Sequence, residues 1–178
     1  MRRAVFFDRD DTLIVDVPYN GDPDRVELLP RAREACHLLN ENGFLLFIIS
    51  NQSGVGRGFI TREQVEAVNQ RVLHLLGEHL FTDIYCCYDD PNDPIDGCRK
   101  PSPAMIFQAR DAYELELSSC FMIGDKRSDI QAGHAAGCRT VFLESRSDPR
   151  ERQAAHEQAD FVTTDLFRAA EWICKVST

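Results

Sequence analysis

The sequence predicts an α/β fold built on a doubly wound, mostly parallel, Rossmann-like sheet. Short apolar runs alternate with amphipathic stretches along the chain, a rhythm typical of βαβ units whose sheet is covered by helices on both faces. The chain has 178 residues, of which 43% are hydrophobic, so it is long and apolar enough to form one ordinary core. We therefore expect a single domain covering residues 1–178 and exclude a disordered or low-complexity chain.

Six apolar runs are predicted to be strands, and helical periodicity predicts five helices between and after them. The strands are expected at residues 4–7, 44–50, 84–87, 120–124, 140–143 and 161–163. The helices are expected at residues 31–41, 61–79, 103–113, 128–136 and 165–175. Residues 16–27 and 88–101 fit neither pattern, and such excursions from a compact α/β domain are more often functional than neutral.

Charge and cysteine content limit the expected partners and the compartment. The chain has 20 basic and 29 acidic residues, a net charge of −9 that repels nucleic acid and anionic membrane surfaces. Its longest apolar run, residues 44–49, is too short to span a bilayer. The seven cysteines are odd in number and scattered, which predicts reduced thiols in the cytoplasm rather than disulfides. We expect a cytoplasmic monomer.

Polar residues follow the expected strands at the edge where ligands bind in open α/β sheets. Asp8 and Asp10 directly follow the first strand and can project to the same side. Their carboxylates would oppose each other's ionisation unless a cation lies between them, and hard oxygen ligands suit Mg²⁺. A solvated acidic turn is the alternative interpretation of this pair.

The second and later strands carry further polar groups. Ser50 ends the second strand and precedes a glycine-rich loop, residues 51–58, whose N–H groups could hold phosphate; an ordinary polar turn is the alternative. Lys100 precedes a proline-defined helix start, where its ammonium could neutralise a charged intermediate, although most lysines are simply exposed. Asp125 lies at the tip of the fourth strand and Asp129 in the next helical turn, a position that Asp commonly occupies.

In this order, these features resemble the four-motif pattern of the haloacid dehalogenase superfamily of phosphohydrolases. The phrases FDRD at 7–10, SNQSG at 50–54, RG at 57–58, CRKP at 98–101 and GDK at 124–126 look like one branch of it. That branch contains the D-glycero-D-manno-heptose 1,7-bisphosphate 7-phosphatases and the histidinol-phosphate phosphatases. The resemblance covers residues 4–145 and implies a fold of haloacid dehalogenase type. The intervals between the motifs are too short for a cap domain.

The resemblance also implies a reaction: Mg²⁺-dependent hydrolysis of a phosphomonoester through an aspartyl phosphate. Asp8 would be the nucleophile and Asp10 the general acid and base, while Ser50, Arg99 and Lys100 hold the phosphoryl group. Mg²⁺ would be held by Asp8, the Asp10 carbonyl and Asp125, with Asp129 behind them. The implied substrate-binding residues are Asp16, Val17, Pro18, Tyr19, Ser50, Asn51, Gln52, Ser53, Arg57, Arg99, Lys100 and Lys126.

The implied substrate is a small phosphorylated metabolite, most closely a sugar bisphosphate that loses its 7-phosphate in the manner of the heptose enzymes. Histidinol phosphate or another small metabolite is the alternative within the same reaction class. A different class, a receiver-like signalling module, also forms an aspartyl phosphate, but its length and the position of its Asp pair fit less well. A catalytically silent binding module is a further alternative.

Two departures from the branch pattern matter. Asp11 stands where the family has Gly, and Asp tolerates the left-handed backbone that such a turn requires. The branch also has Cys-x-His and Cys-x-Cys ligands for structural Zn²⁺, where this chain has Cys87 with Asp89 and Asp96 with Cys98. Structural zinc sites use Cys and His, so we expect no zinc here.

Overall fold

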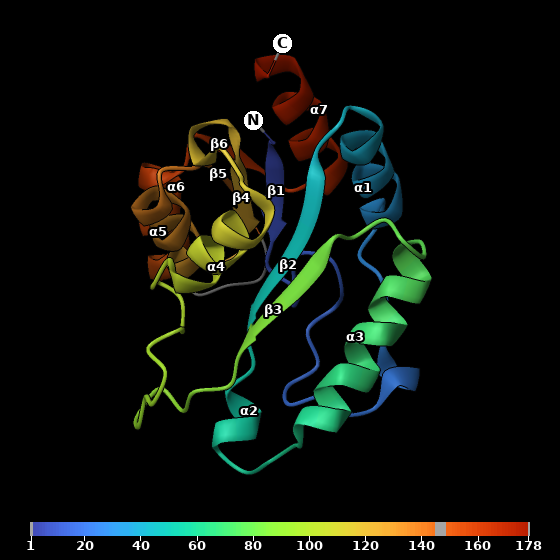
Figure 1. Cartoon of the computed structure of the whole chain (residues 1–178), viewed down its shortest axis with the longest axis vertical. Coiled ribbons are helices and arrows are strands. Elements are labelled where there is room, and N and C mark those ends of the chain that lie inside the picture. Colours follow the sequence, from blue (N-terminus) through green and yellow to red (C-terminus); the bar gives the residue numbers. More distant parts are fainter. Residues whose placement is uncertain (1, 145–148, 178) are drawn as a thin grey trace.

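The fold is a six-stranded sheet in which every neighbouring pair of strands is parallel (Figure 1). The computed structural model describes residues 2–144 and 149–177. The strands are β1 (Ala4–Phe7), β2 (Leu45–Asn51), β3 (Asp83–Cys87), β4 (Phe121–Gly124), β5 (Arg139–Leu143) and β6 (Phe161–Thr163). Their order across the sheet is β3-β2-β1-β4-β5-β6. The predicted doubly wound α/β architecture is confirmed.

Helices cover both faces of the sheet, as Figure 1 shows with α4, α5 and α6 on the left and α1 and α3 on the right. The helices are α1 (Ala32–Glu41), α2 (Ser53–Gly56), α3 (Arg62–Leu76), α4 (Ala104–Tyr113), α5 (Arg127–Ala136), α6 (Pro149–Gln158) and α7 (Leu166–Val176). Two short 3₁₀ turns, η1 (Pro23–Arg25) and η2 (Leu117–Ser119), complete the described elements.

Alternate residues of the strands pack into separate clusters, because successive side chains of a strand point to opposite faces. The described residues form two main cores and a small third cluster of Ile130, Phe142 and Ala155. On β1, Val5 and Phe7 pack in the cluster formed with α1, α3 and α7. Ala4 and Phe6 pack instead in the cluster formed with α4 and α5. All four side chains are fully buried, so the end of β1 is held rigidly from both sides.

The observed elements depart from the expected ones in three places. The expected strand bounds differ from the observed ones by at most one residue at an end. Helix α3 ends at Leu76 rather than at residue 79, because Gly77 takes a backbone conformation (φ 138°) that stops it. Residues 53–56 of the expected loop form the single turn α2, and α6 was not predicted at all.

The strand order brings the functional candidates together. Strand β1 lies between β2 and β4, so their carboxyl ends meet at the position where the order of the strands reverses. Asp8 follows β1, Ser50 and Asn51 end β2, and Asp125 follows β4. In residues 2–144 and 149–177, no helix is both long enough and apolar enough to cross a membrane.

Candidate active site

The centre of the site is a buried ion-pair network around Lys100. Its Nζ lies 2.7 Å from Oδ1 of Asp8 and 2.6 Å from Oδ1 of Asp129, and it also donates to the carbonyl oxygen of Ile49 at 2.9 Å. Asp8, Lys100 and Asp129 are each at most 5% exposed. An ammonium with three acceptors in this dry environment is held in one position, directly beside the Asp8 carboxylate.

The charges around Asp8 keep its carboxylate ionised. Burial works to raise the pKa of Asp8, but the ammonium groups of Lys100 and Lys126 outweigh burial and lower it. Burial would likewise lower the pKa of Lys100, yet Asp129 and Asp8 raise it. The pair therefore presents a carboxylate next to an ammonium, the form that a nucleophilic Asp requires.

Asp125 completes a set of carboxylates that fits a divalent cation. Oxygen atoms from Asp8, Asp125 and Asp129 all lie within 4.8 Å of one another, and all three residues are buried. Burial, together with the nearby charge of Asp8, raises the pKa of Asp125 to about 8. A hard cation would offset this crowding of negative charge, and carboxylate oxygens are the ligands that Mg²⁺ prefers.

Gly124 makes this crowding possible. A Cβ atom at position 124 would overlap the side chain of Asp129, so only glycine allows the carboxylate to pack against the end of β4. Oδ2 of Asp129 also accepts a hydrogen bond from the backbone N–H of Lys126 at 3.0 Å, which fixes its orientation.

Asp10 lies on the other side of the site and is held by its neighbours. Gln52 donates from Nε2 to Oδ2 of Asp10 at 2.9 Å and to Oγ of Ser50 at 2.8 Å. Arg9 contacts both carboxylate oxygens of Asp10, at 3.1 to 3.2 Å. The resulting network ties the ends of β1 and β2 together beside a cavity that Asp10 and Gln52 both line.

A cavity of about 400 Å³ opens in front of these groups. It is lined by Asp8, Arg9, Asp10, Asp16, Val17, Pro18, Tyr19, Asn20, Asn51, Gln52, Ser53, Gly54, Arg99, Lys100, Lys126, Ser128 and Asp129. Most of the residues singled out from the sequence thus come together. Of the site residues predicted from the sequence, all of which are described, Ser50, Arg57 and Asp125 lie outside this lining. Ser50 and Asp125 are buried.

Cationic and aromatic side chains form the rim of the cavity. Arg57 donates to the hydroxyl of Tyr19 at 3.0 Å, and Tyr19 packs edge-on against Phe59 with ring centroids 4.8 Å apart. Partial burial and the nearby charge of Arg57 lower the pKa of the Arg99 guanidinium. Two guanidinium groups placed close together raise the local positive potential, which favours an anionic ligand.

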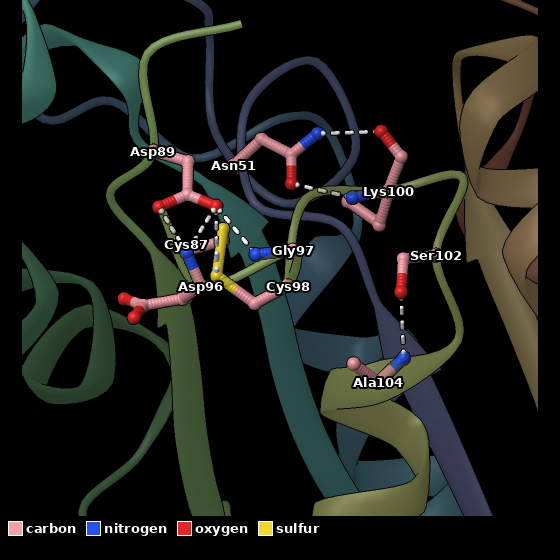
Figure 2. Close-up of a disulfide and its surroundings, with 9 residues drawn as sticks. All are labelled: Asn51, Cys87, Asp89, Asp96, Gly97, Cys98, Lys100, Ser102 and Ala104. Carbon is pink, nitrogen blue, oxygen red and sulfur yellow. Dashed lines mark hydrogen bonds between the residues drawn. A yellow bond between two sulfur atoms is a disulfide. The ribbon is translucent and has the colours of Figure 1, made fainter. Parts of the chain in front are cut away.

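Asn51 fixes the backbone that carries Lys100. Its Nδ2 donates to the Lys100 carbonyl at 3.2 Å, and its Oδ1 accepts from the Lys100 N–H at 3.0 Å (Figure 2). This two-point contact joins the end of β2 to the loop after β3. Asn51 therefore positions the Lys100 main chain, in addition to lining the cavity as the sequence predicted.

The expectation that all cysteines are reduced is wrong for two of the seven. Cys87 and Cys98 form a disulfide, whereas Cys36, Cys86, Cys120, Cys138 and Cys174 are free (Figure 2). Cys87 ends β3, and the loop that follows folds back so that the two Cα atoms lie 5.6 Å apart, within reach of a disulfide. The cysteine count therefore no longer argues for a reducing compartment.

Asp89 organises the same loop. Its carboxylate accepts hydrogen bonds from the backbone N–H groups of Asp96 and Gly97, at 2.9 to 3.2 Å (Figure 2). Oxygen and sulfur atoms of Asp89, Cys87 and Cys98 still lie within 4.8 Å of one another. In the disulfide form the two sulfurs are bonded to each other and offer no thiolate; the expectation of no zinc stays a prediction.

The turn after Asp10 takes the conformation predicted for it. Asp11 lies in the left-handed region with φ 56°, and its N–H donates to the carbonyl of Ile14 at 2.8 Å. Its side chain also accepts from the backbone N–H of Asp16 at 3.1 Å. Asp in place of Gly thus supports the segment that leads to the cavity lining.

Four residues in the lining are absent from the site residues predicted from the sequence: Arg9, Asn20, Gly54 and Ser128. Arg9 lies between the two expected carboxylates, and its type alone suggests a surface residue. Gly54 had a detectable signal in its glycine-rich loop; a Cβ atom there would overlap the Tyr19 ring, so the glycine lets α2 approach the rim.

Comparisons with known proteins agree with this fold and identify the family. Residues 97–169 match a family of HAD-hydrolase-like proteins. The D-glycero-D-manno-heptose-1,7-bisphosphate 7-phosphatase of Chlorobaculum tepidum is 34% identical over 183 residues, covering 94% of this chain and 92% of the relative. The D-glycero-beta-D-manno-heptose-1,7-bisphosphate 7-phosphatase of Escherichia coli K12 is 31% identical, covering 96% and 87%.

Two solved structures show the same fold. A HAD-like phosphatase from Mesorhizobium loti superposes with a TM-score of 0.77 at 29% identity, covering 97% of this chain and 87% of the other. A D,D-heptose 1,7-bisphosphate phosphatase from B. bronchiseptica, solved with magnesium and phosphate, superposes with a TM-score of 0.85 at 24% identity, covering 99% of each chain.

Fold, site and relatives together define a class of hydrolase. The chain belongs to the haloacid dehalogenase-like phosphatases, in the family that contains the D-glycero-D-manno-heptose-1,7-bisphosphate 7-phosphatases. It is an enzyme of the phosphatase type, which decides against the receiver-like module considered from the sequence.

Proposed function

We propose that the protein hydrolyses a phosphomonoester in two steps, with Asp8 as the nucleophile. The observation that carries the proposal is the buried Asp8 carboxylate, held 2.7 Å from Lys100 at the floor of the cavity. An oxygen of Asp8 attacks phosphorus, the bond to the leaving oxygen breaks, and Asp10 donates a proton to that oxygen. Water then attacks the aspartyl phosphate, Asp10 accepts its proton, and phosphate leaves with Asp8 regenerated.

Positive groups stabilise the phosphoryl oxygens during both steps. Lys100, Lys126 and Arg99 line the cavity around Asp8 and supply fixed positive charge. Mg²⁺ would be held by Asp8 and Asp125, where it would neutralise charge on the transferring group, and Asp129, whose Oδ1 is paired with Lys100, would lie behind them. Ser50 is proposed to bind the phosphoryl group, and the Asp10 carbonyl to complete the ligand set, as the family resemblance implies.

The proposed substrate is D-glycero-D-manno-heptose 1,7-bisphosphate, from which the 7-phosphate is removed. The names of the relatives support this, at 34% and 31% identity over nearly the whole chain. A cavity of about 400 Å³ suits a small metabolite. Arg99 in the lining and Arg57, which lies outside it but donates to the Tyr19 hydroxyl, could bind a second charged group. Asp16–Tyr19 would line the sugar.

We also propose that residues 1–178 form a single phosphatase domain, because the ion-pair network, the cavity lining and the main cores are built by one continuous sheet and its helices. The expected cytoplasmic monomer stays a proposal: five free cysteines agree with a reducing compartment, whereas the Cys87–Cys98 disulfide argues against one.

Phosphate release from a substrate panel tests the proposal. The panel contains both anomers of heptose 1,7-bisphosphate, histidinol phosphate and simple sugar monophosphates, each assayed with Mg²⁺ and with EDTA. We expect Mg²⁺-dependent turnover that is fastest with a heptose bisphosphate. Asp8→Asn should lose turnover while keeping its melting temperature. Near-normal rates in that variant would refute the mechanism, and faster turnover of simple monophosphates would refute only the substrate.

A further inference from the structure

Arg9 is an arginine in an unusual place. Only 2% of its surface is exposed, although burying a guanidinium carries a large desolvation cost unless its donors are paired. Nε donates to Oδ2 of Asp10 at 3.2 Å, and Nη2 contacts both Oδ1 and Oδ2 at 3.1 to 3.2 Å. The planar group therefore grips the Asp10 carboxylate along the edge that carries both oxygens.

Asn69 anchors the opposite end of the guanidinium. It lies on α3, 60 positions along the chain, and its Oδ1 accepts from Nη1 of Arg9 at 2.8 Å. It is 6% exposed and interrupts an apolar stripe formed by Val65, Val68, Val72 and Leu76. A buried amide among aliphatic side chains is costly unless its polar atoms have partners. Here Oδ1 is paired with Arg9, and Nδ2 donates to Sγ of Cys86 at 3.5 Å.

These contacts form one chain from the helix layer to the site. It runs from Asn69 through Arg9 to Asp10 and, by the Gln52 amide, to Ser50. Without these neighbours, the short side chain of Asp10 would be free to rotate in the cavity. Held by Arg9 on one side and Gln52 on the other, its carboxylate has one orientation.

We propose that Arg9 and Asn69 are positioning residues that aim the Asp10 carboxylate at the leaving oxygen. The inference rests on the proposed role of Asp10 as general acid and adds two residues that touch neither metal nor phosphate in that scheme. A misaimed Asp10 slows the first step mainly for substrates whose leaving group must be protonated, whereas hydrolysis of the aspartyl phosphate, in which Asp10 acts on water, is slowed equally for every substrate. Loss of these contacts therefore harms substrates unequally in the first step alone.

Two aromatic phosphomonoesters of similar size distinguish a loss of acid catalysis from general damage to the site. p-Nitrophenyl phosphate releases a stable phenolate that needs little help from an acid, whereas benzyl phosphate releases an alkoxide that must be protonated. The values of kcat/KM for both are measured with Mg²⁺ for the wild type, Arg9→Met and Asn69→Leu. Asp10→Asn gives the full effect of losing the acid. Arg33→Met removes a guanidinium that donates to the Leu76 carbonyl away from the site and serves as the control.

We expect Arg9→Met to lower kcat/KM for benzyl phosphate by about 100-fold and that for p-nitrophenyl phosphate by less than about 5-fold. Asn69→Leu should show the same bias at about 10-fold, because Arg9 loses its anchor but keeps its contacts to Asp10. Arg33→Met should change both substrates equally or not at all. The bias should appear in kcat/KM, which reports transfer of the phosphoryl group to Asp8; where hydrolysis of the aspartyl phosphate limits kcat, kcat should fall equally for both substrates.

Equal losses of kcat/KM on both substrates in Arg9→Met and Asn69→Leu, or no loss in either, would overturn the positioning role. If Arg9→Met does not fold by circular dichroism, Asn69→Leu decides alone. Failure of the proposed function looks different: the wild type would show no Mg²⁺-dependent hydrolysis, or Asp10→Asn would lack the bias itself.

Discussion

Charge balance at single residues sets the chemistry of the site. Lys100 reaches two carboxylates and a backbone carbonyl, so its ammonium is fully paired although it is buried. Removing it would leave Asp8 and Asp129 buried close together with only the more distant charge of Lys126 to offset them, which is costlier than the loss of the pairs themselves. The same residue thus stabilises the fold and prepares the nucleophile.

A second charged residue, Asp160, makes the free energy of unfolding depend on pH through contacts away from the site. Oδ2 of Asp160 accepts from the backbone N–H and the hydroxyl of Thr140, at 2.7 and 3.0 Å, and lies 3.5 Å from His134. Partial burial works to raise the pKa of Asp160, but these hydrogen bonds outweigh it and hold the pKa below the ordinary value.

We predict that Asp160→Asn lowers the free energy of unfolding by about 1 kcal/mol at pH 7, a value reduced for a side chain that is 41% exposed. A lowered folded-state pKa stabilises the protein above the unfolded-state pKa of about 4, and this contribution disappears as pH falls through the folded-state value. Urea unfolding at pH 7, 5 and 3 should show the two proteins converging at acid pH. A constant difference would contradict the assignment, and Asp111→Asn, in an exposed pair with Arg110, is the control.

Sequence reasoning reached some residues of the site and not others. Asp8, Lys100 and Asp125 could be predicted because each follows a recognisable strand or precedes a helix start, and parallel strands end at one edge. Arg9 and Asn69 could not, because their meeting depends on how α3 packs on the sheet. No local pattern marks a residue whose partner lies 60 positions away.

At the scale of elements, the strands and helices with many apolar residues could be located from the sequence, and the polar ones could not. Strands β1, β2 and β4 are buried runs and were located to within one residue. Helix α6 was missed because it is strongly polar; among its described side chains only Ala155 is buried, against Ile130 and Phe142. Such a helix has no amphipathic stripe for the sequence to reveal.

The loop after β3 is held by covalent and polar contacts rather than by an apolar core. Its disulfide joins residues 11 apart, and Asp89 binds the backbone between them. We predict that Cys98→Ser lowers the free energy of unfolding by about 3 kcal/mol, as expected for a closed loop of this length. The wild type under a thiol reductant should show a similar loss by urea unfolding.

Zinc content and thiol count test whether Cys87 and Cys98 form a disulfide or bind a metal. We expect protein purified without added metal to hold no stoichiometric zinc and to show five titratable thiols after unfolding. Close to one zinc per chain with seven titratable thiols would contradict the disulfide and indicate a metal site in its place.

At the scale of the whole molecule, charges of both signs are concentrated in the cavity of a chain whose net charge is −9. Its lining has four cationic side chains and four carboxylates: Arg9, Arg99, Lys100 and Lys126, with Asp8, Asp10, Asp16 and Asp129. A divalent cation bound to the carboxylates would shift this balance toward positive charge and favour an anionic substrate. The two main cores hold this edge of the sheet rigid, so the carboxylates and cations keep their spacing.

Trapping the phosphoryl group on the protein tests the central claim, that Asp8 carries it. Enzyme mixed with Mg²⁺ and its best substrate is quenched in acid during turnover, reduced with borohydride and digested for mass spectrometry. An aspartyl phosphate is reduced to homoserine, so we predict homoserine at position 8 in the wild type and none without substrate. Phosphate release with position 8 unmodified, or homoserine at another carboxylate, would contradict the account.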